Sequence, residues 1–235
     1  MKKGSLLAAL RRELARAAVP EKAAGMQAYM KSAMPYHGVP STPARQVFKK
    51  VFAPLVLEDE ATWRRLVLEL WRGARFREER YGALWLCGDG RARPFQTLDA
   101  LPLYEEIIVT GAWWDYVDDV ASHRVGPILR AFPGPMKKTM LEWSRCDDMW
   151  KRRTSIICQL GFKAETDLDL LFRCIEPSLD SKEFFLRKAI GWALRQYAWT
   201  DPKPVLRYVE EHEDRLSGLS RREALKNIRR GASSG

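Results

Sequence analysis

Residues 149–157 read Met-Trp-Lys-Arg-Arg-Thr-Ser-Ile-Ile, and this stretch decides the fold because the chain echoes it twice. Met149 is followed four positions later by a base, Arg153, and then by small and apolar side chains. The same order recurs in Phe76…Arg80-Tyr81-Gly82-Ala83-Leu84 and in Phe184…Lys188-Ala189-Ile190-Gly191-Trp192. Arg80 precedes Arg153 by 73 positions and Lys188 follows Arg153 by 35, so the first interval is about twice as long as the second.

An interval of this size is typical of paired-helix repeats, which run to roughly 34–47 residues. Such repeats stack into a solenoid, and corresponding helices then line its concave face. We therefore predict an all-α fold, a curved superhelical solenoid of HEAT-like paired-helix repeats. Asp118 falls near the missing midpoint of the long interval, so the inner surface is expected to carry Arg80, Asp118, Arg153 and Lys188. An irregular helical bundle is the alternative.

Helical periodicity continues along the whole chain, and no alternating β-branched runs predict strands. Residues 1–230 are expected to form a single domain and residues 231–235 a disordered tail. The third helix is expected to start with Thr42 as its N-cap. The predicted helices are an N-terminal one that stops near Pro20, then Glu21–Lys31, one that follows Thr42, Ala61–Gly73, Arg77–Cys87, Leu101–Thr110, Trp113–His123, Val125–Phe132, Pro135–Ser144, Met149–Gly161, Asp167–Ile175, Glu183–Thr200, Lys203–Glu211 and Ser220–Arg230.

Charge points to the kind of partner. Lys and Arg outnumber Asp and Glu by 40 to 30, which gives a net charge of +10 and favours an anionic partner such as nucleic acid or a membrane surface. Nine tryptophans favour nucleic acid, because aromatic side chains among basic residues commonly contact the sugars and nucleobases of nucleic acids. A merely soluble basic protein is the alternative that charge alone leaves open, and a protein–protein scaffold is a further functional alternative.

Several classes of protein are disfavoured. The four cysteines and three histidines are scattered, with no CxxC pair, so neither a metal nor a disulfide framework is expected and the cysteines are interpreted as reduced core residues. No apolar run approaches the roughly 20 residues that span a bilayer, and Arg11 and Arg12 interrupt the N-terminal apolar run before a secretory signal can form. We expect a cytoplasmic, nucleoid-associated monomer that needs no cofactor and no membrane.

The segment Trp113-Trp114-Asp115-Tyr116-Val117-Asp118 carries the most unusual chemistry. In a helix, Trp114 and Asp118 share one face, so an indole and a carboxylate point at the same space. Both groups stabilise positive charge, on a ligand or at a reacting carbon. The alternative is structural, with the indoles in the core and Asp115 complementing the helix dipole.

Together with Trp150-Lys151-Arg152-Arg153 and the segment Phe184–Tyr197, this motif resembles the AlkD family of DNA alkylation repair enzymes. The resemblance covers about Tyr29 to Pro202. It implies a superhelix of HEAT-like repeats that holds duplex DNA in a groove and hydrolyses the N-glycosidic bond of cationic N3- and N7-alkylated purines. Carried over by position, Trp114, Asp118 and Trp192 would be catalytic, with Arg153 and Arg195 as basic residues beside them.

We further expect Arg153 and Arg195, helped by Arg152, Lys188 and Arg80, to hold DNA phosphates without reading bases. An alkylated purine leaves as a neutral base, so no general acid is needed. Asp118 would stabilise the oxocarbenium-like sugar and orient water, while the two indoles pack on the sugar. The resemblance implies that the base stays in the duplex. The alternative function is a non-catalytic HEAT-repeat DNA-binding module.

Overall fold

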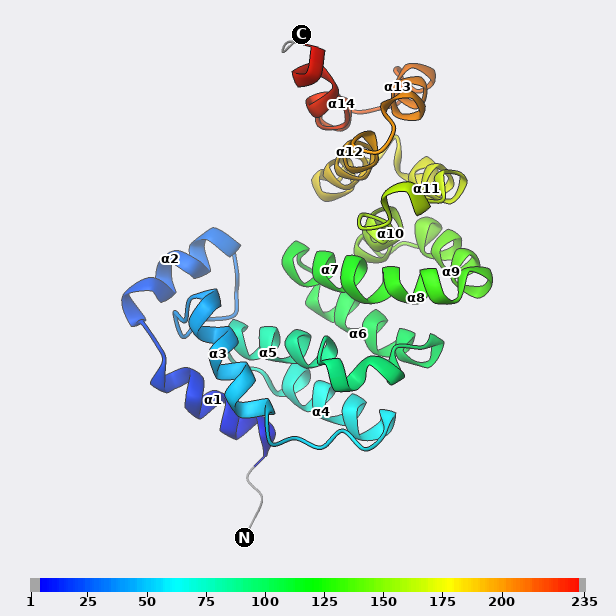
Figure 1. Cartoon of the computed structure of the whole chain (residues 1–235). Helices are drawn as coiled ribbons and strands as arrows, with labels where there is room; N and C mark the ends of the chain where they lie inside the picture. The colour runs from blue at the N-terminus through cyan, green and yellow to red at the C-terminus, as the bar shows by residue number, and fades with distance from the viewer. Residues whose placement is uncertain (1–4, 233–235) are drawn as a thin grey trace. The chain divides into compact units, whose positions relative to one another are not determined.

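The computed structural model describes residues 5–232, and every regular element in that range is helical (Figure 1). Fourteen α-helices pack on their neighbours, and none of the described residues forms a strand. The predicted all-α class of packed helical repeats is therefore confirmed. The chain divides into two compact units, residues 1–103 and 104–235, and α6 (Leu101–Gly111) begins in the first and continues into the second. The single domain expected over residues 1–230 stays a prediction.

The first unit is built around α1. Its helices are α1 (Leu6–Arg16), α2 (Pro20–Met30), α3 (Ser41–Phe52), α4 (Glu60–Gly73) and α5 (Arg77–Cys87). The apolar face of α1 packs against α3, α4 and α5, and its Leu10 and Leu14 are fully buried. Helix α3 begins two residues earlier than expected, at Ser41 with Pro40 as its N-cap, so Thr42 lies inside the first turn and is not the cap. Two 3-10 helices that the sequence did not predict follow α5, at Gly90–Phe95 and Leu98–Ala100.

Two buried carboxylates at the start of α5 fix the surrounding loops. Glu78 accepts hydrogen bonds from the backbone N–H groups of His37, Gly38 and Val39, at 2.9–3.0 Å. Glu79 accepts two from the Arg11 guanidinium, at 2.6 and 3.0 Å, and so joins α1 to α5. Burial raises the pKa of Glu79, but the hydrogen bonds from its cationic and backbone partners outweigh it and lower that pKa to about 2.

The second unit stacks its helices in two rows. One row runs α7 (Trp114–Val120), α10 (Met149–Ile157), α12 (Phe184–Ala198) and α14 (Gly218–Ala232), each packed against the next. Helices α9 (Pro133–Arg145), α11 (Leu168–Ile175) and α13 (Pro202–Glu211) make the second row: α9 packs on α11, and the Phe172 and Tyr208 rings stack between α11 and α13. Short 3-10 turns occur at Lys163–Glu165 and Glu176–Ser178. This two-row order is that of paired-helix repeats.

A π-helical segment follows α7 directly. Residues Ala121–Val125 form this turn and lead into α8 (Gly126–Ala131) without a break, where the sequence predicted two separate helices. A Cβ at Gly126 would lie 2.3 Å from the Cys158 carbonyl oxygen, so only glycine allows this continuous helical segment to pass so close to the end of α10. Insertion of a π turn shifts the following helix by one residue and often occurs beside functional sites.

The C-terminal helix covers α12. Ala224 and Leu225 are buried and Ile228 packs against the same core, as the predicted apolar stripe of this helix requires. A Cβ at Gly191 of α12 would lie 2.5 Å from the Glu223 Cβ, so α14 approaches at the distance that a glycine allows. The backbone of α14 is helical to Ala232, inside the stretch predicted as a tail, and residues 233–235 lie outside the described residues.

Candidate active site

A carboxylate and a guanidinium from successive helices of one row form the centre of the site. Arg153 on α10 donates from Nε to Oδ1 of Asp118 at 2.7 Å and from Nη2 to Oδ2 at 2.8 Å. The two side chains are 5% and 15% exposed. Two parallel charge-assisted bonds fix the plane of the carboxylate as well as its position. The separation of these residues is the 35-position interval of the repeat, so the pair joins equivalent positions of neighbouring repeats.

Arg153 is itself held from α12. Its Nη1 donates to the Phe185 carbonyl oxygen at 2.5 Å, and its guanidinium lies 5.9 Å from the centre of the Phe185 ring. Trp113 and Trp150 surround the same ring, with centroid distances of 5.3 and 5.0 Å. This aromatic cluster excludes water from one side of the ion pair, which strengthens the electrostatic attraction.

Burial affects the charge of Asp118. It raises the pKa of this carboxyl above the ordinary value, and the hydrogen bonds and charge of Arg153 act in the opposite direction. A carboxylate in such a site is poorly solvated, so a cation placed beside it is attracted more strongly than in water. This environment suits a group that stabilises positive charge.

Trp114 begins the helix that carries Asp118. Helix α7 runs from Trp114 to Val120 with Trp113 as its N-cap, so the predicted helical spacing is confirmed and the indole precedes the carboxylate by one turn on the same face. Trp114 is half-buried, which leaves part of its ring to a ligand. Asp115 lies in the first turn, where its charge complements the helix dipole. Tyr116 is fully buried in the core.

Trp192 lies on α12, half-buried and packed against the core of the second unit. Lys188 and Arg195 stand on either side of it, four residues before and three residues after. Both bases pair with Glu223 of α14: Lys188 Nζ lies 3.2 Å from Oε1, and Arg195 contacts Oε2. Glu223 has no sequence signal, because it lies 28 residues from Arg195 in a helix that was assigned only a structural role.

The other two basic residues predicted to bind phosphate, Arg152 and Arg80, lie in different surroundings. Arg152 is half-buried and donates from Nη2 to the Pro177 carbonyl oxygen and to Ser178 Oγ, both at 2.9 Å. Arg80 belongs to the first unit, where its guanidinium stacks 4.4 Å from the centre of the Trp71 ring. The structure thus brings Asp118 and Arg153 into contact, and Lys188 and Arg195 onto one carboxylate, whereas Arg152 and Arg80 have partners of their own.

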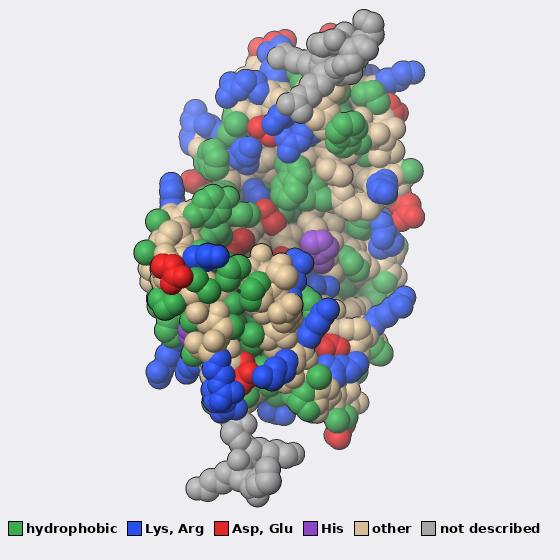
Figure 2. Space-filling view, turned by 60° about the vertical axis from the view of Figure 1, so that its left-hand side comes forward, with side chains coloured by type: hydrophobic (Ala, Val, Ile, Leu, Met, Phe, Trp, Pro, Cys, Tyr) green, Lys and Arg blue, Asp and Glu red, His purple; other side chains and the backbone are tan. Residues whose placement is uncertain are grey.

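Positive charge is spread over the surface, as the face in Figure 2 shows, with hydrophobic side chains exposed among the Lys and Arg groups. Cys87, Cys158 and Cys174 are buried, as expected of core residues, whereas Cys146 is only half-buried. No cluster of three or more potential metal ligands occurs among the described residues. Within that part of the chain, no helix has the length and apolar character needed to cross a membrane.

The structure combines packed helical repeats with an indole, a carboxylate and basic side chains on successive helices of one row, and comparison with known proteins identifies the family. The model of the DNA alkylation repair enzyme family matches residues 10–228. The chain therefore belongs to this family of DNA repair enzymes, and DNA is its partner.

Among solved structures, the chain is similar to a predicted DNA alkylation repair enzyme from Enterococcus faecalis. The two share 28% sequence identity, the match covers 89% of this chain and 95% of that one, and the TM-score is 0.80. No curated protein matches the chain.

Proposed function

We propose that the protein is a monofunctional DNA glycosylase that removes cationic N3- and N7-alkylated purines, such as 3-methyladenine and 7-methylguanine. The supporting observation is the Asp118 carboxylate, held in plane by Arg153 and carried one turn after Trp114 on the same helix face. A fixed carboxylate beside an indole is suited to stabilise a cation at a defined point.

The chemistry of the substrate fits this arrangement. Alkylation gives the purine a positive charge, so the base leaves as a neutral molecule when the glycosidic bond breaks and no general acid is required. The positive charge then passes to the deoxyribose, which becomes oxocarbenium-like, as in other glycoside hydrolyses. Asp118 stabilises this cation and orients the attacking water, while Trp114 and Trp192 pack against the sugar.

Arg153 gains a second role from its contacts. The sequence predicted a phosphate contact, which stays a prediction. Its buried guanidinium gives three of its donors to Asp118 and to the Phe185 carbonyl, and we propose that it positions the Asp118 carboxylate. Arg195, Lys188, Arg152 and Arg80 remain the proposed phosphate ligands.

The enzyme would leave an abasic site and work on the sugar from outside the duplex. A lyase step needs an amine that attacks the sugar carbon as a Schiff-base nucleophile, and no lysine lies in the segment Trp113–Asp118. With the base left stacked, the size of its adduct is not limited by a pocket. The alternative of a non-catalytic DNA-binding module shares the fold and the charge, so only a measurement of base release separates the two.

The test is release of free 7-methylguanine from a methylated duplex in the presence of EDTA. We expect base release with an intact abasic strand that alkali then cleaves. Strand cleavage without alkali would indicate a lyase, and absence of base release, or release that needs an added metal, would refute the proposal.

A further inference from the structure

One face of α12 alternates aromatic and basic side chains along its whole length. Phe184, Lys188, Trp192, Arg195 and Trp199 are spaced four, four, three and four residues apart. At 100° per residue they fall within an arc of about 80°. We call these five residues the α12 stripe. Helices that bury an apolar face in a core do not place bases between the aromatic side chains, so this face is suited to another partner.

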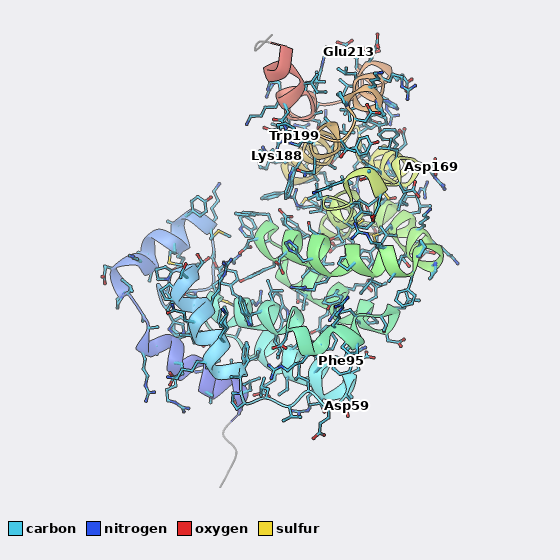
Figure 3. All side chains as sticks on the ribbon, viewed as in Figure 1. Asp59, Phe95, Asp169, Lys188, Trp199 and Glu213 are labelled. Carbon is cyan, nitrogen blue, oxygen red and sulfur yellow. The ribbon has the colours of Figure 1, made fainter. Side chains whose placement is uncertain are left out.

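The ends of the stripe are the parts that are most exposed. Phe184 is 57% exposed and Trp199 is 71% exposed, and both are among the few large hydrophobic side chains that the described part of the chain leaves open to solvent. Figure 3 labels Lys188 and Trp199, which lie on the same side of α12. An exposed indole at the end of a helix costs free energy in water, and a partner that covers it would recover that free energy.

The charge of the stripe and its position around Trp192 indicate DNA as the partner. Trp192, proposed to contact the sugar of the damaged nucleotide, lies in the middle of the stripe, and the two bases beside it carry positive charge. Glu223 pairs with both bases, yet the Lys188 and Arg195 side chains remain 37% and 22% exposed, so each keeps an open side. Basic side chains that alternate with aromatic rings suit a sugar–phosphate backbone, in which anionic phosphates alternate with apolar sugar faces.

We propose that α12 lies along one strand of duplex DNA and that Phe184 and Trp199 pack on backbone sugars on opposite sides of the lesion, an inference that rests on the proposed function for the place of Trp192. Trp199 follows Trp192 by seven residues and Phe184 precedes it by eight, which corresponds to roughly 10 and 12 Å of helix. Each strand advances about 3.4 Å per nucleotide along the duplex axis and further along its own backbone, so each contact falls within roughly three nucleotides of the lesion.

The experiment measures the affinity of Trp199→Ala, Phe184→Ala and wild type for a fluorescein-labelled, undamaged 20-base-pair duplex. Each aromatic truncation is expected to weaken binding about fivefold, at the low end of aromatic contacts to nucleic acid. Trp199→Phe keeps a ring and should restore most of the affinity. Leu206→Ala is the matched control, because Leu206 is an exposed hydrophobic residue of α13 outside the stripe and its truncation should leave affinity unchanged.

Duplex length then tests the direction of the stripe. Duplexes carrying 7-methylguanine are shortened to one base pair beyond the lesion on one side or on the other. Shortening on one side should abolish the effect of Trp199→Ala, and shortening on the other side that of Phe184→Ala. Equal binding of the variants and wild type, a loss that ignores duplex length, or a loss of both effects from the same side would overturn the proposal.

Two further readouts separate the remaining explanations. Thermal unfolding of each variant should match wild type, and Trp199→Phe tests the contact without a cavity if Trp199→Ala proves unstable. A change of sedimentation coefficient in Trp199→Ala, with DNA affinity intact, would assign the stripe to a second copy of the chain and overturn the proposal. Binding of undamaged duplex is independent of catalysis, so failure of the stripe and failure of the glycosylase assignment give different results.

Discussion

At the scale of single residues, Asp118 carries a negative charge in a place where burial opposes it. The two Arg153 hydrogen bonds make this charge tolerable and fix its direction. Only interactions that are stronger in the transition state than in the ground state speed the chemical step. The cationic sugar forms only as the glycosidic bond breaks, so the charge of Asp118 should act on the rate and little on binding.

Asp118→Asn keeps the shape of the side chain and removes its charge. We expect the single-turnover rate of base release to fall by about a hundredfold or more, with DNA affinity within about twofold of wild type. Asp169→Asn is the control, since Asp169 is an exposed carboxylate of α11, labelled in Figure 3, that pairs with Arg173 one turn later. A wild-type rate in Asp118→Asn would make Asp118 a structural residue.

The acid limb of the pH profile reports the same carboxyl. Because burial raises the pKa of Asp118, base release should decline with falling pH at a point above the ordinary aspartate value of about 3.9. Arg153 lowers this pKa, so Arg153→Gln should move the decline to still higher pH and reduce the rate at neutral pH. The comparison requires single-turnover rates of both proteins from pH 4 to 9. An identical inflection in the two would show that Arg153 does not act through Asp118.

Residue types at the centre of the site could be predicted from sequence, whereas their contacts could not. The spacing of Trp114 and Asp118 predicts a shared face because helical geometry is local. Pairing of Asp118 with Arg153 depends on how two repeats stack, and the repeat interval places the residues at equivalent positions without saying that they touch. Phe185 contributes its backbone carbonyl, a contact that no side-chain pattern can reveal.

At the scale of elements, the packing of α14 on α12 controls the charge of the proposed DNA surface. Glu223 offsets part of the positive charge of Lys188 and Arg195. Glu223→Gln should therefore raise affinity for undamaged duplex about threefold and steepen the dependence of log affinity on log salt by up to about one unit, because one further phosphate is neutralised.

Glu213→Gln provides the matched control for Glu223. Glu213 pairs with Arg221 and is labelled in Figure 3, and its replacement changes net charge by the same amount. Equal gains in the two variants would show a general charge effect. Weaker DNA binding by Glu223→Gln would mean that the carboxylate holds the two bases in a binding arrangement.

The close approach of the same two helices can be tested through Gly191. An added Cβ would lie 2.5 Å from the Glu223 Cβ and 2.8 Å from the Ser220 carbonyl oxygen, so α14 must move. We expect Gly191→Ala to destabilise the second unit by about 1–3 kcal/mol, measured by urea unfolding. Gly25→Ala in the interior of α2, where an added Cβ meets nothing within 4 Å beyond its chain neighbours, should be neutral or slightly stabilising because alanine favours helix. Equal stabilities of the two variants would contradict the tight α12–α14 contact.

Most helices could be predicted from sequence because their apolar periodicity and their proline or glycine boundaries are local signals. Arg77–Cys87, for example, has the predicted bounds. The π turn at Ala121–Val125 could not, since it depends on the approach of Gly126 to the end of α10. The short 3-10 helix at Gly90–Phe95 was missed for another reason: its glycine and proline are typical of irregular loops.

At the scale of the whole molecule, the first compact unit has a source of pH-dependent stability. Glu79 links α1 and α5 in the first unit, and its lowered pKa means that its contribution to stability is complete above the unfolded-state value near 4.5 and is lost as pH falls towards 2. Glu79→Gln should cost on the order of 2–3 kcal/mol at pH 7, and the difference from wild type should shrink as the pH falls below about 4. Urea unfolding at pH 7, 5 and 3 measures this; a difference that stays constant with pH would show that the charge of Glu79 is not what stabilises the unit.

The 35-position step between Asp118 and Arg153 limits how this chain can change in length. Each repeat supplies half of the ion pair, so a repeat transplanted alone into a relative brings a carboxylate without its guanidinium, or the reverse. A single-residue insertion inside α7 or α10, next to Asp118 or Arg153, would turn that side chain by about 100° relative to the packed face of its helix and away from its partner. We therefore expect relatives of this protein to differ in the lengths of their loops. The two repeats that carry α7 and α10 should be duplicated or exchanged only together, because each supplies one partner of the ion pair.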